Sequence, residues 1–256
     1  MLFKRLFETN QRLKSLRNWI WGVLFATFLS IASANVIIEG TRVVYKQGER
    51  DVTVKLTNTN TQKNALVQVW LDDGNATAAP EESTTPFIIT PPLAKIPAGR
   101  NQAVRITFVG DKMKQDRETL YWFNVLEIPP KSNEPNVLSF AIRTRIKFFY
   151  RPKSISTASI NHGEKTEWHW KQTDKGLQLE LTNNAPTFLS YFEISAMINN
   201  TPAVLSGGGM VNPFDKLVIN LNEIKQLPTE KIKITLKAVN DFGGESVTEH
   251  LIDPVK

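Results

Sequence analysis

Short runs of alternating apolar and polar residues make up the chain from Asn35 onward. An alternation with a period of two residues is typical of a β-strand that buries one of its faces. Turn residues, mostly Gly, Pro, Asn and Asp, interrupt the runs at short intervals. Before Pro152 the expected strands are 52–58, 65–71, 87–90, 102–109, 120–128 and 136–152. Their spacing predicts an immunoglobulin-like β-sandwich.

A second all-β unit is expected after a polar stretch at 153–158. Pro152 suits the exit of a strand into a linker, because proline has a fixed φ and no backbone N–H. The expected strands of this unit are 168–172, 176–183, 188–198, 216–221, 231–239 and 246–252. The run Gly207-Gly208-Gly209 is expected to be a hairpin turn, since no Lys-Ser/Thr pair and no helix follow it as in a phosphate-binding loop. The pattern therefore predicts two domains, 35–152 and 158–256.

Residues 1–34 have the pattern of a leader. Its basic residues are Lys4, Arg5, Arg12, Lys14 and Arg17. An uncharged apolar run from Trp19 to Ile31 follows; it is about 13 residues long, whereas a helix needs about 20 to span a bilayer. Ala32-Ser33-Ala34 then supplies the small residues that a signal peptidase accepts. We expect a secretory signal at 1–34 and a mature chain from Asn35; a retained membrane anchor is the alternative.

Positive charge is concentrated in this leader. The formal net charge is +6, and residues 1–34 hold five basic residues and one acidic residue, a net +4. Subtraction leaves about +2 for residues 35–256, which gives no case for nucleic-acid binding. The chain has no cysteine. That excludes disulfides, a thiol nucleophile and a thiolate metal site.

The sequence offers little that points to catalysis. An active site needs nucleophiles, acids, bases or ligands that converge, and the histidines match no metal-ligand spacing. These are His162, His169 and His250, expected to be surface or loop residues. The carboxylates Asp116, Glu118 and Glu127 are expected to be solvated or to form structural ion pairs. We therefore predict a protein that is not an enzyme, with no metal and no cofactor.

The expected strand 136–152 has two different rows of side chains. One row is bulky and apolar, with Leu138, Phe140, Ile142, Thr144, Ile146, Phe148 and Tyr150. The other row is small and then cationic, with Val137, Ser139, Ala141, Arg143, Arg145, Lys147 and Phe149. An ordinary sandwich strand would bury the first row and expose the second. Because the start of the strand is compatible with a core on both faces, an exposed apolar row that invites another β-chain is the alternative.

Several segments resemble the periplasmic pilus-assembly chaperones of Gram-negative bacteria. They are GTRVVY (40–45), ITPPLAKIPAG (89–99), QDRETLYWFNVLEIPPK (115–131), IKFFYRP (146–152), TNNAPTFLSYFEI (182–194), MVNPFDK (210–216) and NDFGG (240–244). The resemblance implies two immunoglobulin-like domains in a boomerang arrangement. It also implies a function: the protein captures pilus subunits in the periplasm, completes their immunoglobulin fold and delivers them to an outer-membrane usher without ATP.

The resemblance assigns roles to particular residues. Arg42 and Lys147 are implied to bind the carboxylate at the C-terminus of the subunit. The implied donor-strand residues are Leu138, Phe140 and Ile142, with the small opposite row facing the protein's own core. A charged cluster that braces the two domains is implied at Glu118, Arg151 and Asp241. The short connection between 120–128 and the long strand resembles the branch of the family that serves rod-like and tip-bearing pili.

Strict alternation places Lys147 on the face opposite to Phe140 and Ile142. The strand is therefore expected to twist, bulge or leave the sheet between Thr144 and Ile146. Arg143 and Arg145 lie in the same row as Lys147, and are expected either to steer acidic partners or to be solvated.

Two other functions fit an exported β-protein: a pilus subunit or other structural surface protein, and an immunoglobulin-like binding module, for instance for carbohydrate. A pilus subunit is usually a single domain, often with a disulfide, and the tail SVTEHLIDPVK (246–256) and the lack of cysteine fit it poorly. A binding module leaves it unexplained that Arg42, Lys147 and the alternating strand occur together. An exposed apolar edge also allows weak self-association of the free protein. No nucleic-acid partner is expected, nor stable membrane insertion after removal of the signal.

Overall fold

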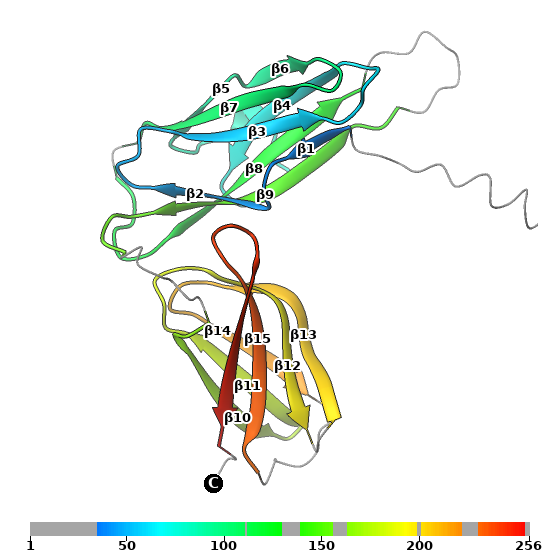
Figure 1. The fold of residues 1–256 in the computed structure, drawn as a ribbon. Coiled ribbons are helices and arrows are strands. Elements are labelled where there is room, and N and C mark those ends of the chain that lie inside the picture. The colour runs from blue at the N-terminus through cyan, green and yellow to red at the C-terminus, as the bar shows by residue number, and fades with distance from the viewer. Residues whose placement is uncertain are drawn as a thin grey trace, which may run out of the picture. The chain divides into compact units, whose positions relative to one another are not determined.

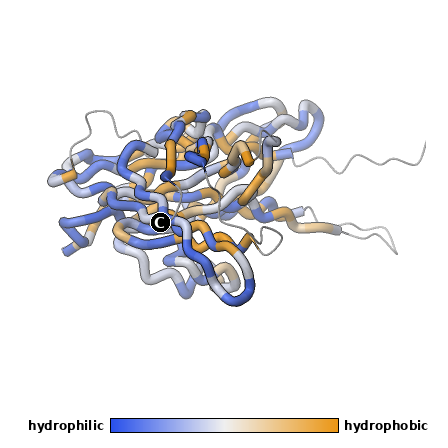
Figure 2. The backbone as a smooth tube through the Cα atoms, turned by 90° about the horizontal axis from the view of Figure 1, so that it is seen from below, coloured by the Kyte–Doolittle hydropathy of each residue, from blue (hydrophilic) through white to orange (hydrophobic). Residues whose placement is uncertain are grey.

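The computed structural model describes residues 35–110, 112–129, 139–155, 163–198, 201–221 and 230–253. These ranges consist of β-strands and connections, with one 3-10 helix, η1 (Pro80–Glu82). Most strands follow the alternating sequence runs, and Figure 2 shows hydrophobic and hydrophilic residues interspersed along the backbone. Within the described ranges, no helix is long and apolar enough to cross a membrane.

The first sandwich contains β1 to β9 in two sheets (Figure 1). One sheet has the order β1 (Val36–Ile38), β3 (Val52–Asn58), β7 (Asn101–Phe108) and β5 (Phe87–Thr90). The other has the order β2 (Arg42–Lys46), β9 (Ile142–Arg151), β8 (Thr119–Ile128), β4 (Ala65–Asp72) and β6 (Leu93–Ile96). Their inner faces share one apolar core, in which Tyr45, Phe148 and Tyr150 are fully buried.

The second sandwich contains β10 to β16. Its three-stranded sheet has the order β10 (Thr166–Thr173), β11 (Gly176–Asn183) and β14 (Lys216–Leu221). Its four-stranded sheet has the order β13 (Thr201–Val211), β12 (Leu189–Ile198), β15 (Ile232–Val239) and β16 (Glu245–Ile252). A separate core with Trp168, Leu179 and Ile234 lies between these sheets. The all-β, two-sandwich prediction is therefore confirmed.

Strand β13 corrects the prediction of a hairpin turn at Gly207-Gly208-Gly209, because the strand runs through all three glycines. Gly209 lies opposite Tyr191 on β12. A Cβ at Gly209 would lie 2.3 Å from the hydroxyl oxygen of Tyr191, which is buried in the second core. Glycine is therefore required here because of the close approach of an aromatic side chain rather than a change in chain direction.

The pairing of β9 excludes two of the three expected departures from a regular strand, the bulge and the exit from the sheet. Strands β8 and β9 pair without a register shift from Thr119 opposite Tyr150 to Glu127 opposite Ile142. No bulge therefore separates Thr144 from Ile146. Alternation continues along β9, so Phe148 and Tyr150 face the core while Lys147 faces away from it.

Candidate functional site

Arg42 and Lys147 are direct neighbours on adjacent strands. Strand β2 pairs with β9 in parallel, and the register places Arg42 opposite Lys147. Residues that lie opposite one another on paired strands project from the same face of the sheet. The Nη1 of Arg42 donates to the carbonyl oxygen of Val239 at 3.2 Å, and the Nζ of Lys147 donates to the Oγ of Ser190 at 2.9 Å. The two predicted anchor residues are thus brought together.

This pair of cations lacks a neutralising anion. Among the described residues, neither Arg42 nor Lys147 has a carboxylate within 4.0 Å. Burial, and then the charge of Arg42, lower the pKa of Lys147 to about 8. Burial also lowers the pKa of Arg42, although the charges of Asp241 and Glu118 oppose this effect. The Nε of Arg42 is buried and has no hydrogen-bond partner in the described part of the chain. Two partly desolvated cations with an unused donor form a site suited to an anion.

A cavity of about 430 Å³ adjoins the pair. Its lining residues are Thr41, Arg42, Trp122, Arg145, Ile146, Lys147, Ser190, Tyr191, Phe192, Gly208, Gly209 and Val239. Besides the pair, the wall contains Arg145, two hydroxyl residues, and aromatic, aliphatic and glycine residues. The cavity can therefore take a group that carries both an anion and apolar atoms.

Next to the cation pair, strand β9 has an open edge. Strand β2 covers only Lys147 to Arg151, so on that side Ile142 to Ile146 have no strand partner within the described residues. Phe140 is 72% exposed and Ile142 is 37% exposed. Leu138, the third predicted donor residue, lies outside the described residues. An open edge beside exposed apolar side chains is a place where another β-chain can pair.

The expectation that the small row faces the protein's own core is wrong for the residues that can be checked. Ser139 and Ala141 are exposed, as are Phe140 and Ile142. The core contacts of the strand come from later members of the bulky row: Phe148 and Tyr150 belong to the core and Ile146 packs against it. Strand β9 itself begins only at Ile142, so the described residues 139–141 of the expected strand 136–152 are not strand, and neither row is buried there.

Arg143 and Arg145 form a network that the sequence did not predict. Both bind the carboxylate of Asp72 on β4, with 2.9 Å between Nε of Arg145 and Oδ2 and 3.3 Å between Nη2 of Arg143 and Oδ2. The side chain of Asp72 is 1% exposed. The guanidinium of Arg143 lies 4.7 Å from the ring centroid of Trp70, and that of Arg145 lies 4.0 Å from the ring centroid of Trp122. The two arginines are neither freely solvated nor available for steering, because a buried acid and two rings hold them.

The predicted charged cluster forms around Arg151. Its Nε donates to Glu118 at 2.6 Å, and its Nη1 and Nη2 donate to the two oxygens of Asp241 at 2.6 and 2.7 Å. The other oxygen of Glu118 accepts the backbone N–H of Phe188 at 2.9 Å. The cluster therefore joins the end of β9 to the segment before β8, the start of β12 and the turn after β15.

Comparison with known proteins identifies the family. The model of the N-terminal domain of PapD, a pili and flagellar-assembly chaperone, matches residues 35–156. The model of the C-terminal domain of the pili assembly chaperone PapD matches residues 163–250. The chain belongs to the PapD family of pilus-assembly chaperones.

Individual members of the PapD family agree with this assignment. Chaperone protein HifB of Haemophilus influenzae is 40% identical over 221 residues, which cover 84% of this chain and 86% of HifB. The YadV chaperone, a probable fimbrial chaperone of Escherichia coli, has a crystal structure with a TM-score of 0.72 and 31% identity. The match covers 86% of this chain and all of that one. A structure of the Salmonella enterica SafA pilin in complex with the SafB chaperone gives a TM-score of 0.65 and 26% identity, covering 87% and 99%.

These relatives are named chaperones rather than enzymes, and the scattered polar residues have structural partners. Glu127 bonds to Asn35 and Asp116 to Arg117. The described residues contain no group of three or more His, Asp or Glu side chains that could hold a metal ion. His162 lies outside the described residues, and His169 is exposed on β10.

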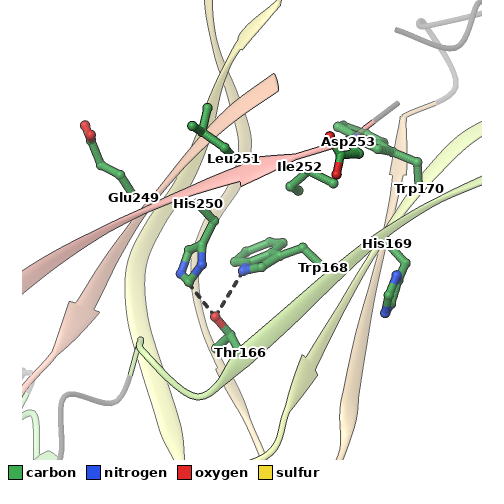
Figure 3. A pocket seen from close by; sticks show the side chains of 9 residues that line it. All are labelled: Thr166, Trp168, His169, Trp170, Glu249, His250, Leu251, Ile252 and Asp253. Atoms are coloured by element: carbon green, nitrogen blue, oxygen red, sulfur yellow. Dashed lines mark hydrogen bonds between the residues drawn. The ribbon is translucent and has the colours of Figure 1, made fainter. Parts of the chain in front are cut away.

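His250 differs from the expectation of a surface histidine, because it is half-buried on β16. In Figure 3 its ring points toward Thr166 at a cavity of about 690 Å³ between β10 and β16. The hydroxyl of Thr166 is 3.2 Å from Nε2 of His250 and accepts from Nε1 of Trp168 at 3.0 Å. Burial lowers the pKa of His250, opposed by a hydrogen bond with the backbone of Gly163. His250 is thus in contact with Thr166 within the second sandwich rather than solvated on its surface.

Proposed function

We propose that the mature chain is a periplasmic chaperone that captures pilus subunits, completes their immunoglobulin fold with strand β9 and passes them to an outer-membrane usher. The proposal takes residues 1–34 as a secretory signal that is removed, and 35–152 and 158–256 as the two domains. One observation carries it: the open edge of β9 at Ile142 to Ile146 leads directly to the cation pair of Arg42 and Lys147.

Strand donation follows from the open edge. A subunit that lacks a strand exposes unpaired backbone groups and an apolar groove. A donated strand can form hydrogen bonds with the backbone groups and fill the groove with its side chains. The edge of β9 offers backbone donors and acceptors, while Phe140 and Ile142 offer apolar side chains at alternate positions. Leu138, outside the described residues, continues this row in the sequence. Burial of each such side chain is worth about 1.5–3 kcal/mol before the costs of association.

The cation pair supplies an anchor for the end of the partner. A C-terminal carboxylate has one negative charge and two oxygens, so it can accept from the fork of Arg42 and from Lys147 together. It would offset one of the two positive charges that burial has partly desolvated. Because the register of β2 and β9 fixes both cations, the anchor would also set which subunit residue meets which position of β9.

The cluster of Glu118, Arg151 and Asp241 is proposed to hold the anchor in position rather than to bind the subunit. Arg151 is four residues after Lys147 on the same strand, and Asp241 lies two residues after Val239, whose carbonyl accepts from Arg42. The ion pairs therefore join the two backbone segments that orient the anchor cations. A shift of this cluster would move the carbonyl of Val239, which orients the guanidinium of Arg42, relative to strand β9.

The partner class is supported by the family. SafB is a chaperone seen in complex with a pilin, and the same kind of partner fits an open edge beside an anion site. A second function, that of an exported immunoglobulin-like binding or structural surface protein, would use the fold without needing the cation pair. Dependence of capture on Lys147 distinguishes the two.

Co-expression in the periplasm tests the proposal. Candidate pilus subunits are produced with the wild-type chain or with Lys147→Met, and soluble subunit is quantified. We expect the wild type to protect one or more subunits from degradation. With Lys147→Met, the amount of soluble subunit should fall at least about tenfold, because a charge-assisted contact is lost. Lys55→Met, which removes a surface lysine of β3 paired with Glu39, is the control and should protect like the wild type.

Folding of the variant is checked by thermal unfolding. Since the folded state lowers the pKa of Lys147, it disfavours the charge there, and a neutral methionine should not lower the Tm. Equal protection by the wild type and a folded Lys147→Met would rule out the anchor. Failure of the wild type to protect any subunit would contradict the chaperone function itself.

A further inference from the structure

Phe242 is an aromatic side chain with almost no contact to the rest of the protein. It lies in the turn between β15 and β16 (Figure 1) and is 94% exposed. Single exposed apolar residues are common on protein surfaces. A phenylalanine at nearly full exposure on a backbone that is held in place is less usual, and the contacts of its neighbours show that the turn is held.

Asn240 fixes the turn from within. Its Oδ1 accepts the backbone N–H groups of Phe242 and Gly244, both at 3.0 Å. Its own N–H donates to the carbonyl of Gly244 at 2.8 Å, and its carbonyl accepts from Gly243 at 3.0 Å. Four hydrogen bonds within five residues leave the backbone at Phe242 little freedom, so the ring is presented with a low cost in conformational entropy.

The two residues that flank Phe242 also tie the turn to the strands of the anchor. Asp241 binds Arg151 of β9 through both carboxylate oxygens. Gly243 has a φ of +84°, and a Cβ there would lie 2.3 Å from the Oγ1 of Thr41. Thr41 precedes Arg42 and lines the anchor cavity. Phe242 therefore projects from a turn that abuts the rim of that cavity.

We infer that Phe242 is a contact residue for the captured pilus subunit, and packs against an apolar surface next to the subunit's carboxyl-terminal segment. The inference rests on the proposed function, because the anchor determines where that segment lies. An aromatic ring on a preorganised backbone is the kind of side chain that dominates interface energies. The subunit is the partner that fits, since the turn that carries Phe242 lies against Thr41, which lines the cavity that would receive the subunit's carboxylate.

Binding measurements test the inference with the subunit that co-purifies with the wild-type chain. We expect Phe242→Ala to weaken the Kd about 10-fold or more, mainly through faster dissociation, while the Tm stays unchanged because the ring contributes nothing to the core. Phe242→Leu should recover part of the affinity. The control Leu251→Ala removes an apolar side chain, 70% exposed, from β16 of the same hairpin and should leave the Kd unchanged. An unchanged Kd for Phe242→Ala would overturn the inference.

A photo-crosslinker identifies the partner directly. Benzoylphenylalanine in place of Phe242 in the full chain should crosslink to the subunit on irradiation in the periplasm. A crosslink to the usher, or to a second copy of this chain, without one to the subunit would overturn the assignment. The Lys147→Met experiment distinguishes a failure of the anchor from a failure of the role of Phe242. Loss of capture in Lys147→Met with an unchanged Kd in Phe242→Ala rejects only the role of Phe242, whereas unaffected capture in Lys147→Met rejects the anchor.

Discussion

Arg42 and Lys147 lie directly opposite one another on the parallel strands β2 and β9, with no carboxylate of the described residues within 4.0 Å of either side chain. Like charges placed opposite one another on a sheet destabilise it. Here burial adds to the cost, and the pKa of Lys147 falls to about 8 as a result. A bound anion would reduce the repulsion between Arg42 and Lys147.

The affinity for a subunit should depend on pH through Lys147. In the free protein this amine is charged below pH 8 and becomes neutral above it. A bound carboxylate favours the charged form and raises its pKa, so above pH 8 binding must take up a proton. We expect the Kd to be constant from pH 6.5 to 7.5 and to weaken by up to about tenfold per pH unit above 8. Titration calorimetry in buffers of different ionisation enthalpy measures both the Kd and the proton uptake.

Lys147→Arg is the matched variant for this dependence. Arginine stays charged throughout the range, so its complex should show no proton uptake between pH 7 and 9. A wild-type Kd that does not change up to pH 9 would show that Lys147 does not contact the carboxylate.

The exposed segment that leads into β9 should matter for capture but not for stability. Phe140 is 72% exposed, so Phe140→Asp leaves the protein's own core intact. In a subunit groove the same change would bury an unpaired carboxylate, and we expect capture to fall below detection. Co-expression yield and Tm are the two measurements. Ile88→Asp, at a residue of β5 that is 53% exposed, is the control and should capture normally. Normal capture by Phe140→Asp would contradict strand donation at this position.

The ion cluster around Arg151 should be costly to break. The side chains of Arg151 and Glu118 are 2% and 1% exposed. Arg151→Met leaves a buried carboxylate without its cation, and we expect the free energy of unfolding in urea to fall by about 3–5 kcal/mol. Arg105 pairs with Asp51 at 3.6 Å on the surface, so Arg105→Met should cost less than about 1 kcal/mol. Equal effects of the two substitutions would mean that the cluster has no special structural role.

Asp72 should contribute to stability in a pH-dependent way. Burial raises its pKa, but hydrogen bonds from Arg145, Asn124 and the backbone of Gly74 outweigh burial, and the pKa lies below its usual value. A carboxyl with a depressed pKa adds stability above the unfolded pKa of about 3.9, which is lost as the pH falls through the folded value. Asp72→Asn should therefore cost about 1.5–3 kcal/mol at pH 7. The difference from the wild type should shrink below pH 4.

Hydrogen exchange locates this effect. Arg143 and Arg145 alternate along the open half of β9, so loss of their acid should speed exchange of the amides from Ile142 to Ile146 more than in the core strand β3. Uniformly faster exchange across the first sandwich would contradict a local role for Asp72 on β9.

Much of this architecture could be predicted from the sequence. The alternation of apolar residues identified most strands because each strand buries one face, and this relation needs only local information. The long strand was visible for the same reason, and so was its excess of apolar side chains at the start. Resemblance to the pilus-assembly chaperones, rather than the pattern itself, selected Arg42 and Lys147 among many strand cations.

Only the tertiary structure decided the strand register, the contacts between charged side chains and the open edge, because each of these depends on segments that are distant in sequence. The parallel register of β2 and β9 makes Arg42 a neighbour of Lys147, and no local pattern contains that register. Asp72 holds Arg143 and Arg145 across the sheet, and Gly209 is required by a ring on the next strand. The open edge from Ile142 to Ile146 likewise exists only because β2 is too short to cover it. The sequence by itself determined where most of the strands form, whereas their pairing determined which charges meet and which edge stays open.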